Sequence, residues 1–129
     1  MSTLKVNTIQ DTGGGSGVTP EQISNGRAKV WARYGANDTT LDDSYNVSSI
    51  SSTGQGVFTI NFTTSFANTN YVVAGSANRE GADGDNVPMV TGTSRDGFAT
   101  GSCRINVGWQ DNNTLYNCEA IGVVIYGDQ

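Results

Sequence analysis

The chain has 129 residues and a mass of 13.5 kDa, which suits one compact domain with a short tail. Its hydrophobic fraction is 36%, below the roughly 45–50% apolar usage of an ordinary globular chain, and only 15% of its residues are charged. Abundant Gly, Asn, Ser and Thr favour short strands joined by tight turns. Helical bundles and parallel βαβ folds are disfavoured by the same composition.

The charge pattern excludes several classes of protein. Histidine is absent, which removes the Ser-His-Asp triad, the Cys-His pair and the imidazole metal ligand. A net charge of −5 and a pI near 4.3 argue against nucleic-acid binding, which depends on clustered basic residues. No apolar run approaches a membrane span, and the first residues lack the apolar stretch of a signal peptide. We therefore expect a soluble protein without membrane insertion.

Residues 1–16 differ from the rest of the chain. Apolar Leu4, Val6 and, after a change of phase, Ile9 lie among polar residues, which predicts a short amphipathic strand. The glycine-rich stretch 11–17 has the composition of a flexible linker. A lone strand is not stable by itself, so this arm must either return to the main sheet or dock on another chain.

A short helix is predicted next, over about residues 20–25. Thr19 is a suitable N-cap, Pro20 suits the first helical position, and Gly26 suits the C-terminal stop. A helix this short is a connector rather than a core element.

From Arg27 onward the hydrophobic residues repeat with the period of two that is typical of strands. The first strand, 27–34, has an outward side with three cations and Trp31, which their stems or a neighbouring subunit could cover. Its inward residues are Ala28, Val30, Ala32 and Tyr34, and its outward residues are Arg27, Lys29, Trp31 and Arg33.

Further strands are expected near 44–50, 57–62, 71–77, 87–93, 97–109 and 118–126. The strand 71–77 reads as buried on both faces, and Pro88 suggests that 87–93 is an edge strand. The core side is assigned to Phe58, Ile60 and Phe62 of one strand and to Ile121, Val123 and Ile125 of another. The fold class is therefore all-β, an antiparallel β-sandwich over residues 17–129 with an N-terminal arm and one connecting helix.

The two cysteines allow two interpretations. If 97–109 and 118–126 form a hairpin that turns near 110–113, Cys103 and Cys118 lie nearly opposite each other, and a cross-strand disulfide is conceivable. The alternative is a pair of reduced, buried side chains in a β core.

The carboxylates also admit more than one interpretation. Glu80, Asp83 and Asp85 could surround calcium in the loop 79–86, but their spacing does not match an EF-hand, and a solvated acidic loop explains them better. Glycoside hydrolysis needs two carboxyls across a cleft, and Glu119 beside the apolar last strand is the best candidate. A domain this small has little room for a cleft, so we expect no enzyme activity, no metal and no cofactor.

The stretch from Trp109 to Tyr116 has the composition of a sugar-binding loop. Its aromatic rings can stack on pyranose rings, while Asp111 and Asn112 can hydrogen-bond to hydroxyls. The alternative is a hairpin tip with one core Trp. The candidate receptor-binding residues are Trp109, Asp111, Asn112 and Tyr116.

Several short segments occur in a characteristic order. They are LKVNTIQD (4–11), GGG (13–15), TPEQI (19–23), GRAKVW (26–31), SYNVSSI (44–50), GVFTINF (56–62), NYVV (70–73) and VVIYG (123–127). This series resembles tail-fibre and related virion proteins of tailed phages, especially those that infect marine and freshwater cyanobacteria. The likeness covers nearly the whole chain, and the order of the segments is more specific than any one of them.

The resemblance implies a non-enzymatic, homotrimeric virion protein that is made in the host cytoplasm and takes part in host attachment. Its partners would be further copies of itself, tail, baseplate or capsid proteins, and a host glycan. We assign anchoring or trimer contacts to Leu4, Val6, Ile9 and Trp31, and glycan contacts to Trp109, Asp111, Asn112 and Tyr116. A capsid decoration or head-fibre protein and a lectin-like carbohydrate-binding module are the alternatives, because the chain lacks the repetitive shaft of full fibres.

Overall fold

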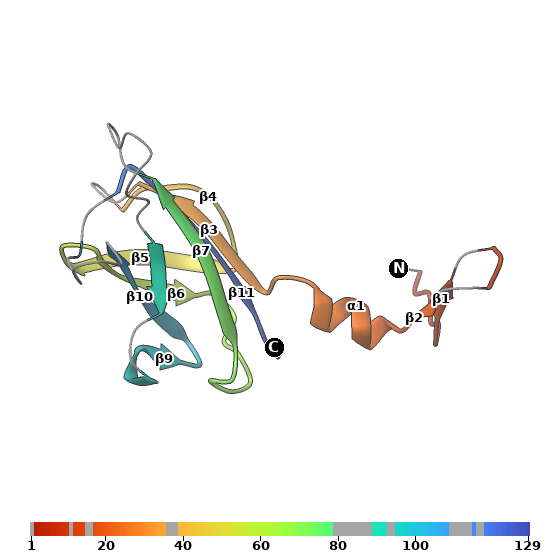
Figure 1. Ribbon diagram of the computed structural model, residues 1–129. Coiled ribbons are helices and arrows are strands. Elements are labelled where there is room, and N and C mark those ends of the chain that lie inside the picture. The colour runs from red at the N-terminus through yellow and green to blue at the C-terminus, as the bar shows by residue number, and fades with distance from the viewer. Residues whose placement is uncertain are drawn as a thin grey trace.

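A computed structural model describes residues 2–10, 12–14, 17–35, 39–78, 89–92, 95–108, 115 and 118–129. Two antiparallel sheets face each other as a sandwich, and a small hairpin and a helix extend from one end of it (Figure 1). The predicted all-β class and the sandwich architecture are confirmed.

The two sheets of the sandwich are called sheet B and sheet C. Sheet B has the order β4–β3–β11–β7, with β3 at Val30–Tyr34, β4 at Leu41–Tyr45, β7 at Val72–Asn78 and β11 at Ala120–Tyr126. Sheet C has the order β5–β6–β10–β8, with β5 at Val47–Gly54, β6 at Val57–Phe62, β8 at Met89–Gly92 and β10 at Ser102–Gly108. A 3₁₀ turn at Arg95–Gly97 leads into β9 at Phe98–Ala99, which pairs with the start of β10.

Alternation along the strands produces the core between the sheets. The inward residues predicted for β6 and β11 are buried, as are Val30, Ala32 and Tyr34 of β3. Phe62, Phe66, Tyr71 and Phe98 form an aromatic cluster whose ring centroids lie 4.6 to 6.0 Å apart. The prediction of β8 as an edge strand is also confirmed.

Two expectations about strand faces are wrong. Strand β7 is not buried on both faces, because it forms the edge of sheet B and leaves Val72 66% exposed. Strand β3 begins at Val30, so Lys29 does not belong to its outward face. Lys29 is buried, and its Nζ donates to Ser24 Oγ at 3.0 Å. Among the four residues predicted to form the cationic face, Trp31 and Arg33 remain on the outer side of β3.

The N-terminal arm differs from the prediction: the strand expected to include Leu4 and Val6 is formed only at Ile9–Gln10, and residues 2–8 are not in a strand. Strand β1 at Ile9–Gln10 pairs with β2 at Gly17–Val18, so the glycine-rich stretch closes a local hairpin. Helix α1 follows at Pro20–Gly26 with the predicted N-cap, and Thr19 and Gln22 form a reciprocal capping box. Gly26 is the last helical residue instead of the predicted stop, and Arg27 is the C-cap. The hairpin and α1 project away from the sandwich (Figure 1).

The predicted single strand 44–50 is two strands that belong to different sheets. Asn46 separates β4 from β5 and adopts the left-handed conformation with φ of 58°. Asn reaches this region more easily than most residues because its short polar side chain can hydrogen-bond locally. The chain therefore leaves the edge of sheet B at Asn46 and enters the edge of sheet C at Val47.

The Asn46 side chain holds this crossing in place. Its Nδ2 donates to the carbonyl oxygens of Lys29 at 3.2 Å and Thr64 at 3.1 Å, and its Oδ1 accepts from the Thr64 N–H at 2.7 Å. Its own carbonyl accepts from the Thr63 N–H at 3.2 Å. One residue thus connects the start of β3, the crossing and the end of β6.

Replacing Asn46 tests this role. We expect Asn46→Ala to lower the free energy of unfolding by about 2–4 kcal/mol, since it removes three side-chain hydrogen bonds and leaves at positive φ a residue without the short polar side chain that favours this conformation. Asn46→Gly loses the same hydrogen bonds but tolerates the backbone, so it should be about 1 kcal/mol more stable than the Ala variant. Urea unfolding of the three proteins measures both differences. Equal stability of the two variants would show that the backbone conformation contributes nothing.

Candidate functional site

Several predicted site residues lie outside the described part of the chain. They are Trp109, Asp111, Asn112 and Tyr116 of the candidate receptor loop, and Glu80, Asp83 and Asp85 of the acidic loop. Over the described ranges, no three His, Cys, Asp or Glu side chains gather in a way that could hold a metal ion. Two surfaces remain as candidates, the N-terminal arm and the outer face of sheet B.

The arm exposes apolar side chains to solvent. Leu4 is 84% exposed and Ile9 51% exposed, and the structure brings Val18 opposite Ile9 through the β1–β2 pairing. No residue of α1 is buried, and Ile23 is 45% exposed. The predicted anchoring residues Leu4, Val6 and Ile9 are therefore exposed on the arm, and Val18 and Ile23 join them there.

The local geometry orders the arm without giving it a core. Gly14 has a φ of 69°, which allows the chain to turn between β1 and β2. Gly17 packs so closely that an added Cβ would lie 2.7 Å from Thr8 Cγ2. An isolated two-stranded hairpin is marginal in water, so burial against a partner is the available source of stability.

The outer face of sheet B carries an aromatic row. Register places Tyr45, Trp31, Val124 and Ala74 side by side across β4, β3, β11 and β7. Trp31 is 37% exposed and Tyr45 is 46% exposed. Trp31, predicted as a contact residue, thus presents part of its ring on an outward surface.

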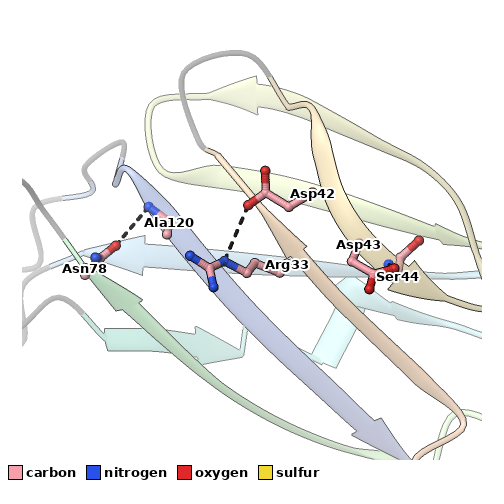
Figure 2. A network of polar contacts seen from close by, with 6 residues as sticks. All are labelled: Arg33, Asp42, Asp43, Ser44, Asn78 and Ala120. Carbon is pink, nitrogen blue, oxygen red and sulfur yellow. Dashed lines mark hydrogen bonds and ion pairs between the residues drawn. The ribbon is translucent and has the colours of Figure 1, made fainter.

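Arg33 lies in the adjacent row of residues on the outer face of sheet B. Its Nε lies 3.4 Å from Asp42 Oδ2, and both side chains are more than half exposed, so the ion pair itself adds little stability. The Asp43 side chain is hydrogen-bonded within β4, where its Oδ1 accepts from the Ser44 N–H at 2.8 Å. Figure 2 shows Asp42 and Asp43 on one side of Arg33, with Asn78 and Ala120 on the other.

The two cysteines do not lie opposite each other in a hairpin, which was the arrangement that would allow a cross-strand disulfide. Cys103 lies on β10 in sheet C, whereas Cys118 precedes β11 in sheet B, because each strand pairs with partners distant in sequence. Neither cysteine is in a disulfide, and both are buried. The structure therefore agrees with the interpretation of Cys103 and Cys118 as reduced, buried side chains.

A buried group of hydroxyls and thiols lies between the sheets. The Tyr34 hydroxyl is buried without a hydrogen-bond partner among the described residues, and the Tyr71 hydroxyl lies 3.0 Å from both the Ala99 and Ser102 carbonyl oxygens. Burial raises the pKa of both Tyr side chains, and the nearby Cys103 raises each further. Burial also raises the pKa of Cys103 to about 11, although a hydrogen bond with Tyr71 works in the opposite direction. The thiol is therefore neutral at pH 7 and a poor nucleophile.

In comparisons with known proteins, no family model, curated protein or solved structure matches the chain. In the described residues, no helix is long and apolar enough to cross a membrane. The N-terminal arm and the outer face of sheet B are therefore the surfaces from which a function is inferred.

The buried thiol generates a prediction about alkaline pH. Because the Cys103 pKa is raised from 9.0 to about 11 in the folded protein, its contribution to stability is complete below pH 9 and is lost as the pH rises through about 11. Urea unfolding of the wild type should show falling stability across this range, and Cys103→Ala should show a smaller fall from its own lower starting value. A parallel fall in both proteins would assign the effect to other groups.

Proposed function

We propose that this chain is a structural protein of a phage virion, anchored through its N-terminal arm and taking part in host attachment through its β-sandwich. The exposed apolar arm is the observation that carries the proposal. Leu4, Val6, Ile9, Val18 and Ile23 form no core of their own, and burial of such side chains on a neighbouring chain supplies about 25 cal/mol for each Å² removed from water.

The placement of the arm supports an anchor at one end and a presented domain at the other. Strand β3 starts at Val30, shortly after α1 ends at Gly26, and runs to Tyr34 at the far end of sheet B (Figure 1). Docking of the arm would therefore leave the Tyr34 end of the sandwich directed outward. The order of sequence motifs, which resembles that of phage tail fibres, suggests a virion as the larger assembly.

The homotrimer that the resemblance implies would give the apolar side chains of the arm a surface on which to be buried. Three copies would bury the apolar residues of each arm against the others. A capsid decoration protein would use the same arm to hold the shell. Antibody labelling of virions distinguishes the two, because a tail protein labels the tail and a decoration protein labels the head.

The mass of the purified chain tests the anchoring role. We expect light scattering to give about three times 13.5 kDa, and a variant without residues 1–16 to give monomers with the unfolding transition of the sandwich intact. Ile9→Asp should also dissociate the oligomer, since it places a charge at an apolar contact. Asn7→Asp, which adds the same charge at a polar position of the arm, is the matched control and should leave the mass unchanged.

A monomer that also fails to bind virions lacking this protein would contradict the proposal. A monomer that does bind such virions would retain the anchoring role and remove the free trimer.

A further inference from the structure

The outer face of sheet B has an open hollow of about 350 Å³ beside Arg33. Its lining comes from three neighbouring strands and includes Arg33 of β3, Ser76 and Asn78 of β7, and Ala120 and Gly122 of β11. The hollow exists because Gly122, which lies opposite both Arg33 and Ser76, has no side chain to fill it. A Cβ at this position would meet Ser76 Oγ at 3.3 Å.

The polar groups around the hollow are donors. Arg33 uses Nε toward Asp42, and among the described residues its two terminal nitrogens have no ion-pair partner; Figure 2 shows them directed over β11 toward Asn78 and Ala120. Asn78 Oδ1 accepts from the Ala120 N–H at 2.9 Å, and this fixes the amide so that its Nδ2 remains a donor. The Ser76 hydroxyl adds a third group that can donate. Arg, amide and hydroxyl donors on one surface are complementary to a carboxylate.

The neighbouring carboxylates do not occupy this hollow. Asp42 lies on the Nε side of Arg33, and Asp43 is hydrogen-bonded to the Ser44 N–H, so neither belongs to the lining. The net charge of −5 repels anions at long range, but exposed charges are screened beyond about 8 Å at physiological salt. Short-range, bidentate contact with Arg33 is therefore the interaction that selects a ligand.

An aromatic surface adjoins the donors. Trp31 lies two residues before Arg33 on the same face of β3, about 7 Å away along a strand. Tyr45 lies opposite Trp31 on β4. Aromatic faces stack on the apolar faces of pyranose rings, so this arrangement suits a sugar that carries an acid group and continues into a neighbouring sugar.

We propose that this hollow binds a uronate sugar of an acidic glycan, with the carboxylate on Arg33 and the next pyranose ring against Trp31. The site lies toward the end of sheet B that is remote from the arm, because Arg33, Asn78 and Ala120 all stand near the Tyr34 end of their strands. The proposal names a receptor class for the attachment role and rests on that role for its biological meaning. Binding itself needs only the purified chain.

Titration followed by backbone amide NMR tests the site. The probes are oligomers of galacturonate, mannuronate and glucuronate, the methyl esters of the same oligomers, and an oligoglutamate peptide. We expect at least one uronate to shift the amide signals of Arg33, Ser76 and Gly122 at millimolar concentration. The ester of that oligomer and the peptide should bind about tenfold or more weakly, because the first lacks the charge and the second lacks the ring.

Variants separate the site from general charge effects. Arg33→Gln should weaken binding about tenfold or more, whereas Arg27→Gln, which removes a cation exposed near the C-terminus of α1, should leave it unchanged. Gly122→Ala tests the hollow without changing the charge and should also weaken binding. Unfolding curves check that each variant is folded.

Three results would overturn the proposal: no shift with any of the uronates, equal binding of the acid and its ester, or equal binding of oligoglutamate, which would identify an acidic-peptide site. These results are independent of the assembly test. A chain that is monomeric and absent from virions, yet binds a uronate through Arg33, would retain this site and refute the virion role.

Discussion

The crossing at Asn46 is the constraint on which the sandwich depends. It joins β4, an edge of sheet B, to β5, an edge of sheet C, and so connects the two sheets along one side of the sandwich. The side-chain hydrogen bonds to Lys29 and Thr64 connect the residue before β3 with the residues after β6. With these two strands aligned, the inward residues Tyr34 and Phe58 meet edge to face, with centroids 5.4 Å apart.

Much of the sandwich follows from the period of two, because alternation reports burial directly. Phe58, Ile60 and Phe62 could be assigned to the core for this reason. The division between β4 and β5 could not, because the sequence from 44 to 50 reads as one polar strand and does not show the backbone turn at Asn46. A hairpin of β10 and β11 was one possibility because they are neighbours in sequence, whereas their actual partners are distant in the chain.

The two candidate surfaces differ in how far they could be predicted. The apolar residues of the arm stand out in a polar segment, so Leu4, Val6 and Ile9 were identifiable, but Val18 became part of the surface only through the hairpin. The hollow at Arg33 could not be anticipated. Its residues come from three strands separated by long stretches of sequence, and only the register of sheet B brings Arg33, Ser76 and Gly122 into one row.

The position of β3 has a mechanical consequence. This strand connects directly to the arm through α1, and it lies inside sheet B between β4 and β11. A pulling force between an anchored arm and a ligand held near Arg33 acts along β3, parallel to its length. Such a force shears the hydrogen bonds to both neighbouring strands together instead of opening them one after another. The architecture therefore places a strand that is hydrogen-bonded on both sides on the line between the anchor and the load.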